Sequence, residues 1–188
     1  MDRRTLLTGI VAVGAAPVIL AQTRPVLAAT PMAAVSTASF QDVKTAAQFY
    51  STVIGRAEIS LATSQVASQK VTQKNALEFA GFELGEAITV NMVLKDTGAT
   101  GPGMDAAAHG MVEKVLSAGQ GKAFDKAYIS LQLENHEYLR DLADAFIHNS
   151  TGVTDPAEVQ GRHLSMLMLA VFKEHVAICK RITSELNA

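Results

Sequence analysis

Glycine and proline divide this chain into long stretches with the periodicity of α-helices. No proline lies between Phe40 and Pro102 or between Pro102 and Pro156, and glycines gather at 98–103, 119–121 and 152. Because these two residues are the strongest local interruptions of regular structure, the segments between them are the candidate elements. Their apolar residues recur every three or four positions, which indicates amphipathic helices rather than strands.

The pattern predicts four long helices and one short one. Ser39 with Asp42 is the expected start of the first helix, and Asp155-Pro156 is the expected start of the last. Four long helices with short connections are typical of an antiparallel bundle, so we predict an all-α four-helix bundle with an extra short helix. The predicted ranges are 40–66, 68–95, 105–116, 122–148 and 155–186.

Two of these helices carry apolar faces that need interpretation. The second should have two stripes, one made by Leu77, Leu84 and Ile88 and the other by Phe79, Phe82, Val90 and Val93. In the last, the run 166–172 is apolar without interruption but is far too short to cross a bilayer. We expect this run to mark the most deeply buried helix; the alternative is an exposed face for self-association.

The first 28 residues have the three parts of an export signal. Arg3-Arg4 begins it, the apolar run 6–21 follows, and Val26-Leu27-Ala28 offers a cleavage site after Ala28. The paired arginines resemble a twin-arginine signal, with Sec export as the alternative. We therefore predict a signal peptide at 1–28, a linker at 29–39, a helical domain at 40–188 and a periplasmic or secreted location.

Charge and cysteine content narrow the possible functions. The whole chain has a formal net charge of −2. Without residues 1–28, which hold three arginines and one aspartate, 13 basic residues face 17 acidic ones. This balance argues against nucleic acid as a partner. Cys179 is the one cysteine, which excludes an intrachain disulfide and a thiolate metal cage, and its place in an apolar helix indicates a buried thiol.

Each long predicted helix directs one ionisable group toward the interior or its edge. These groups are Glu58, Glu86, His136 and His175. Burying a charge without a partner is costly, so the four should meet one another, a backbone group or a cation. Three interpretations stay open: a hydrogen-bonded polar layer that fixes how the helices align, a site for one divalent ion (zinc, iron or manganese), or four unrelated residues.

Di-iron chemistry of the ferritin kind requires Glu-x-x-His pairs, and no glutamate here is followed by histidine at that spacing. Glu83-x-x-Glu86 is a carboxylate pair at the same interval, but such pairs are typical of solvated helix faces.

Asn135 falls in the middle of an apolar stripe, where a buried amide would help to fix helix alignment. We predict no catalytic residue.

Three motifs together resemble a known family. They are the segment 123–128 followed by His136, Phe79-Ala80 with Glu86 seven positions after the phenylalanine, and His175 late in the last helix. They are similar to the ferritin-like family of exported bacterial proteins often labelled "predicted outer membrane protein", a domain of unknown function. The resemblance spans roughly residues 49–182.

The resemblance also covers Glu58, which matches an early glutamate that precedes a Leu-Ala pair in the family. Where the family has an Asp-His pair in its second helix, this chain has Glu86-Ala87, so the carboxylate is kept and the histidine is lost. The resemblance implies a ferritin-like fold and an exported location, and it implies no reaction.

The sequence thus predicts an exported helical-bundle protein with a role in binding or in envelope maintenance and stress response, rather than in catalysis. The first alternative is a metal-binding protein that uses Glu58, Glu86, His136 and His175. The second is a structural module that forms homo-oligomers through 166–172.

Overall fold

A computed structural model of the chain describes residues 40–188, which form five α-helices and no strand. The prediction of an all-α protein is confirmed. The predicted signal peptide and linker lie outside the described residues. The helices are α1 (Ala46–Lys70), α2 (Lys74–Asp96), α3 (Ala106–Leu116), α4 (Lys122–Asn149) and α5 (Pro156–Asn187).

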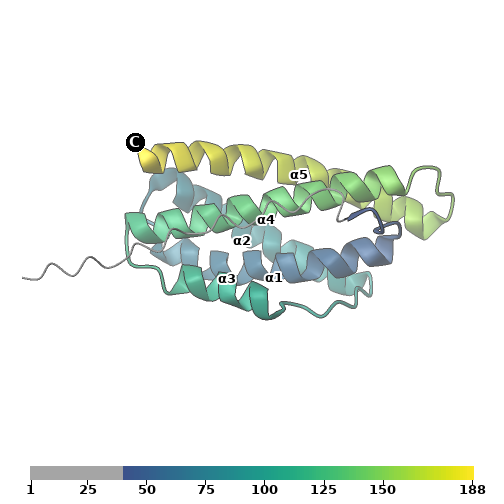
Figure 1. Cartoon of the computed structure of the whole chain (residues 1–188), viewed down its shortest axis with the longest axis horizontal. Helices are drawn as coiled ribbons and strands as arrows, with labels where there is room; N and C mark the ends of the chain where they lie inside the picture. Colours follow the sequence, from purple (N-terminus) through teal and green to yellow (C-terminus); the bar gives the residue numbers. More distant parts are fainter. Residues whose placement is uncertain (1–39) are drawn as a thin grey trace, which may run out of the picture. The chain divides into compact units, whose positions relative to one another are not determined.

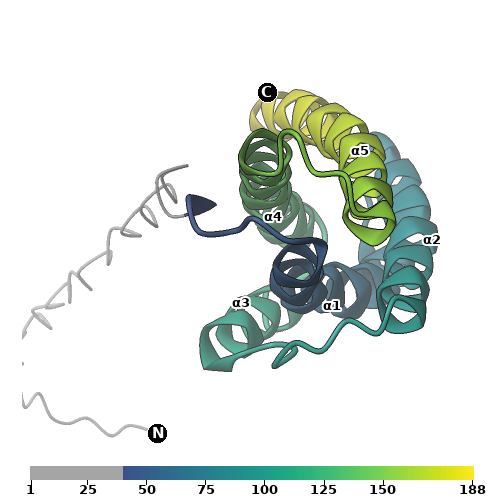
Figure 2. The same ribbon diagram turned by 90° about the vertical axis from the view of Figure 1, so that its right-hand side faces the viewer.

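The four long helices lie side by side, with α1 against α2 and α4 against α5 (Figure 1). Viewed from the end, α1 also packs on α4, and α2 lies beside α5, so that the four enclose a common interior (Figure 2). The short α3 packs on α1 and α4 from outside. No helix in residues 40–188 has both the length and the apolar character that a membrane crossing requires.

The starts of the last three helices agree with the predictions. Asp105 caps α3 by accepting a hydrogen bond from the Ala108 amide, and Asp155 caps α5 by accepting from the amides of Ala157 and Glu158. These are local signals, which a sequence carries in full. The predicted ranges of α3, α4 and α5 differ from the observed ones by a residue at most.

The predicted start of the first helix at Phe40 is wrong. The helix begins at Ala46, because Thr45 and Gln48 form a reciprocal capping box in which each side chain satisfies the other's backbone amide. Both Ser39-Asp42 and Thr45-Gln48 have suitable spacing, and the structure uses the second.

The predicted boundary between the first two helices is also misplaced. α1 runs on to Lys70, and the chain turns at 71–73. The buried carboxylate of Asp125 on α4 accepts hydrogen bonds from the amides of Thr72 and Gln73 and from the Thr72 hydroxyl, at 2.8–3.0 Å. A residue 52 to 53 positions away therefore holds this turn, which local sequence signals cannot indicate.

The core face of α2 differs from both predicted stripes. Leu77, Phe82 and Ile88 are exposed, Phe82 by 64%. The buried face instead mixes small, polar and apolar residues: Ala76, Phe79, Ala80, Glu83, Ala87, Asn91 and Leu94. Its alanines let α2 approach α1 closely, and Asn91 donates hydrogen bonds to the Ala57 and Ala87 carbonyls.

The apolar run on α5 is divided between interior and surface, so the prediction that it marks the most buried helix is wrong. Met168 and Phe172 are buried, whereas Met166 and Leu167 are exposed by 51% and 69%. The run therefore places apolar residues on the exposed face of α5 as well as on the buried one.

Candidate metal centre

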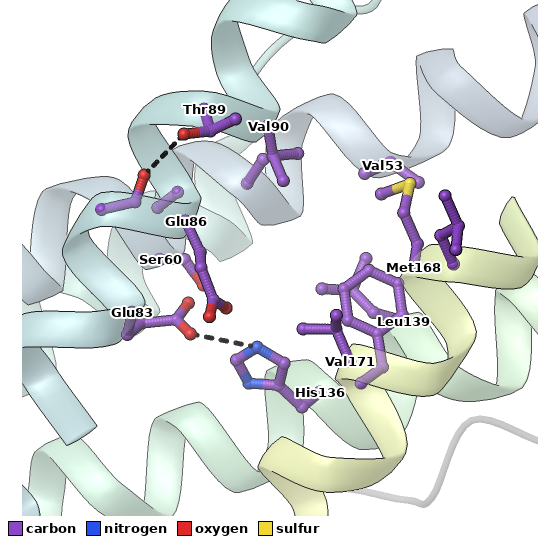
Figure 3. Close-up of a pocket in the computed structure, with 15 residues that line it drawn as sticks. Val53, Ser60, Glu83, Glu86, Thr89, Val90, His136, Leu139, Met168 and Val171 are labelled. Carbon is purple, nitrogen blue, oxygen red and sulfur yellow. Dashed lines mark hydrogen bonds and ion pairs between the residues drawn. The ribbon is translucent and has the colours of Figure 1, made fainter. Parts of the chain in front are cut away.

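Three ionisable side chains from three helices meet in the interior. Glu83 of α2, His136 of α4 and His175 of α5 are all buried, and we call them the Glu–His–His cluster. Oε2 of Glu83 lies 3.0 Å from Nδ1 of His175 and 3.4 Å from Nε2 of His136. Those two ring nitrogens are 3.1 Å apart. Figure 3 shows the Glu83 carboxylate directed at the His136 ring.

Nδ1 of His136, the ring nitrogen that points away from the cluster, contacts a backbone group. This nitrogen lies 2.8 Å from the backbone carbonyl of Gln132, one helical turn earlier. Because a carbonyl oxygen only accepts hydrogen bonds, Nδ1 must carry the proton. In the neutral ring, the lone pair is then on Nε2, the atom that faces Glu83 and His175.

His175 is oriented in the same manner by a different acceptor. Its Nε2 lies 3.0 Å from Oε2 of Glu86, whose side chain is 45% exposed. Nε2 therefore pairs with a carboxylate at the edge of the interior, and Nδ1 points inward toward Nε2 of His136. An outer carboxylate or carbonyl that fixes the far nitrogen of a histidine is the usual second layer of protein metal sites.

Glu83 supplies an oxygen without a hydrogen-bond partner. Within residues 40–188, its Oε2 is the one buried side-chain nitrogen or oxygen that makes no hydrogen bond, and its nearest polar neighbours are the rings of His175 and His136, at 3.0 and 3.4 Å. Such an orphaned group in an interior requires an explanation, and an ion is one of the known explanations.

The electrostatics of the cluster favour charged groups. Burial by itself would raise the pKa of Glu83, but the rings of His136 and His175 hold that pKa down at about 2. Burial would lower the pKa of His175, and the carboxylates of Glu83 and Glu86 raise that pKa to about 9. The cluster therefore keeps an anionic carboxylate at neutral pH, with a proton on His175 in the metal-free form.

The spacing of the three inward atoms matches that of metal ligands. A tetrahedral ion with bonds of about 2.0–2.1 Å holds its ligand atoms roughly 3.3–3.4 Å apart, and an octahedral ion holds neighbouring ligands about 3.0 Å apart. The observed separations of 3.0, 3.1 and 3.4 Å fall in this range. The cluster can therefore hold a metal ion.

Of the four predicted site residues, the structure brings three together and leaves one elsewhere. His136 and His175 are in the cluster, and Glu86 contacts His175 from the edge. Glu58 is not part of this group. Its carboxylate accepts a hydrogen bond from the Met104 amide at 2.8 Å and so anchors the segment before α3.

Glu83 was missed at the sequence level, and the interpretation of Glu83-Glu86 as a solvated pair is wrong for Glu83, which is 3% exposed. A signal did exist, because Glu83 lies four residues after Phe79 and four before Ala87, both of which are buried. Without knowledge of which α2 face packs inward, however, this spacing did not distinguish Glu83 from Glu86.

A mostly apolar pocket of about 320 Å³ adjoins the cluster. All four long helices contribute to it, and Glu83, Glu86 and His136 lie at one end, away from Met168 and Leu139 (Figure 3). The apolar lining comprises Val53, Ala57, Ala87, Val90, Leu139, Leu167, Met168, Val171 and Phe172. The cluster is therefore approached through a pocket large enough for a small molecule.

A second set of interior polar groups lies on α1 and on the part of α4 that precedes His136. The side chains of Ser60, Thr63, Ser64, Tyr128, Gln132 and Asn135 form what we call the amide–hydroxyl network. Gln132 accepts from Ser60 and donates to Thr63, Asn135 donates to Ser60 and to the Arg56 carbonyl, and Ser64 pairs with Tyr128. Asn135 is buried, as its place in an apolar stripe predicted.

Comparison with protein-family models, with curated proteins and with solved structures finds no significant match to this chain. The resemblance to the exported ferritin-like family therefore stays a prediction, and the functional argument depends on the geometry described above.

Proposed function

We propose that this protein binds a single divalent metal ion through Glu83, His136 and His175. One observation carries the proposal: each histidine has its outer ring nitrogen engaged by an acceptor, so that its inner nitrogen faces an orphaned carboxylate oxygen. Two imidazoles and a carboxylate suit zinc, iron(II) or manganese(II). This proposal corrects the expected ligand set by replacing Glu58 with Glu83 and by giving Glu86 an outer role.

The proposal places this site in an exported, ferritin-like four-helix bundle. In support, the paired Arg3-Arg4 fits a pathway that carries folded cargo, which suits a protein loaded with metal before export. The four long helices and the added short one fit that fold class. The role that follows is metal binding in the periplasm or outside the cell, with a connection to envelope maintenance or stress.

The direct test is metal uptake by the purified chain. Titration calorimetry with Zn²⁺, Mn²⁺ and anaerobic Fe²⁺ should give one ion per chain, and protein isolated from the periplasm should contain near-stoichiometric metal. Glu83→Gln keeps the shape but removes the anionic ligand, and we expect it to weaken binding by at least about 100-fold. Glu78→Gln, at an exposed position of the same helix, is the matched control and should bind as the wild type does.

The competing interpretation is a purely structural polar layer. It predicts no stoichiometric ion in any preparation, with a loss of stability in Glu83→Gln as its single effect. Thermal unfolding of metal-free Glu83→Gln, recorded by circular dichroism beside the titration, separates a lost ligand from a lost fold.

Self-association is a second candidate, and the exposed apolar side chains of Phe82, Met92, Met166 and Leu167 support it. Light scattering tests it: a clean monomer at high protein concentration would remove the homo-oligomer from consideration.

A further inference from the structure

The pocket beside the Glu–His–His cluster has the size of a small-molecule site. At about 320 Å³ it is roughly twice the volume of an engineered 150 Å³ cavity that holds benzene, which corresponds to an apolar body of on the order of ten carbon atoms. Val53, Ala57 and Leu139 are buried at its inner side, whereas Leu167 and Val171 are exposed at its outer side. A ligand can therefore reach the interior from the surface between α2 and α5.

The polar groups of this pocket are gathered at one end. Glu83, Glu86 and His136 lie together, and the residues opposite them in Figure 3, such as Val53 and Met168, are apolar. This distribution suits a ligand with one polar head and an apolar body. The head would lie against the cluster, and the body would fill the remainder.

The net charge of the metal-loaded cluster determines which head group the pocket can bind, a conclusion that rests on the proposed function. An ion held by one carboxylate and two neutral imidazoles keeps one net positive charge, and three protein ligands leave a coordination position open to a fourth. A carboxylate head would neutralise that charge and fill that position. Without the ion, Glu83 and Glu86 would repel the same head.

We propose that the pocket binds a small carboxylate amphiphile, with the carboxylate on the cluster-bound ion and an apolar chain or ring of about ten carbons or fewer between α2 and α5. The bound ion then keeps one coordination position free for an organic acid, so the site is not a closed structural centre.

Octanoate is the test ligand, titrated calorimetrically into the full chain with and without Zn²⁺. We expect one octanoate per loaded chain, with binding at least about tenfold weaker to the metal-free form. Because each buried methylene strengthens binding about fourfold, butanoate should bind the loaded chain on the order of 100-fold more weakly. Octylamine, which has the same tail and a cationic head, should show no preference for the loaded form.

A pair of variants on α2 separates the pocket from the ion. Val90 lines the pocket, and Met92 does not, being 60% exposed. Val90→Trp should reduce octanoate affinity by about tenfold or more while Zn²⁺ affinity stays within about threefold. Met92→Trp should change neither. The Co²⁺-loaded chain gives a spectroscopic readout, since a carboxylate that enters the coordination sphere shifts the visible absorption of the ion.

The outcomes distinguish the two proposals. If Zn²⁺ binds but octanoate leaves both the calorimetric trace and the Co²⁺ spectrum unchanged, this inference is overturned and the metal site stands. Equal octanoate binding with and without metal also overturns it, because the head would not be on the ion. A chain that takes up no metal removes the proposed function and this inference together.

Discussion

The amide–hydroxyl network and the Glu–His–His cluster are neighbours on α4, where Asn135 directly precedes His136, and they differ in how their buried polar atoms are hydrogen-bonded. In the network, neutral side chains of α1 and α4 hydrogen-bond to one another, and none of their buried nitrogen or oxygen atoms is left without a hydrogen-bond partner. In the cluster, ionisable side chains from α2, α4 and α5 converge, and Oε2 of Glu83 makes no hydrogen bond.

The two sets are joined at one residue. Gln132 gives its side chain to the network and its backbone carbonyl to His136. The comparison indicates that the network, in which every buried polar atom is hydrogen-bonded, fixes how α1 and α4 align. The cluster, in which a carboxylate oxygen makes no hydrogen bond, is instead arranged to bind an ion from outside the chain.

The largest effect on stability should come from the network. Gln132→Leu removes an amide that is fully buried and leaves the hydroxyls of Ser60 and Thr63 with fewer partners. We expect the free energy of unfolding of the metal-free chain to fall by about 3 kcal/mol, measured by urea denaturation. Ser130→Leu, at an exposed position of the same helix, should change it by less than about 0.5 kcal/mol.

The metal affinity of Gln132→Leu tests whether the two sets are independent. The variant keeps the backbone carbonyl that orients His136, so we expect Zn²⁺ affinity within about threefold of the wild type. A large loss of Zn²⁺ affinity in a folded Gln132→Leu would show that the network and the cluster act as one unit.

The cluster should stabilise the fold only when it is loaded. At a free Zn²⁺ concentration 100 times the dissociation constant, mass action adds about 2.7 kcal/mol to the free energy of unfolding. We expect this gain in thermal or urea unfolding of the wild type and its absence in Glu83→Gln at the same Zn²⁺ concentration. An equal gain in both proteins would place the ion at some other site.

The sequence predicted elements best where the signals were local. Asp105 and Asp155-Pro156 located the starts of α3 and α5, because a cap acts on amides two or three residues away. The break between α1 and α2 was misplaced because Asp125, on a helix later in the chain, holds it. Local rules cannot contain that information.

The site was predicted in part for the same reason. The sequence indicates His136 and His175 because each interrupts or borders an apolar stripe on its own helix, and it indicates Glu86 because apolar residues surround it. The sequence does not indicate Glu83, because the face of α2 that packs inward is rich in alanine and partly polar. Only the packing of α2 against α1 reveals that this face, rather than the one with Phe82, is the buried one.

A change of pH should alter the metal affinity of the cluster and should leave the hydrogen bonds of the network unchanged. The pKa of His175, raised to about 9 by Glu83 and Glu86, means that an ion must displace a proton from this residue at neutral pH. Below that pKa, Zn²⁺ affinity should therefore rise with pH, by about tenfold per unit, or roughly 100-fold from pH 6.5 to 8.5. Calorimetry in buffers of different ionisation enthalpy should detect about one proton released per ion. Affinity that is flat across this interval would contradict the role of His175 as a ligand.

The smallest effect should come from Glu86, which distinguishes an outer residue from a ligand. Glu86→Gln keeps an oxygen near Nε2 of His175 but removes its charge, so the ring stays oriented and becomes a weaker base. We expect Zn²⁺ affinity to fall by about tenfold, well short of the loss in Glu83→Gln, with one ion still bound. Because Glu86 is half-exposed, the stability of the metal-free chain should change by less than about 1 kcal/mol.

If Glu86→Gln and Glu83→Gln lost affinity equally, Glu86 would have to be a direct ligand, with His175 turned so that Nε2 rather than Nδ1 meets the ion. The open position next to the pocket would then be filled by the protein itself, and the contrast between a satisfied network and an unsatisfied cluster would hold only for the metal-free chain.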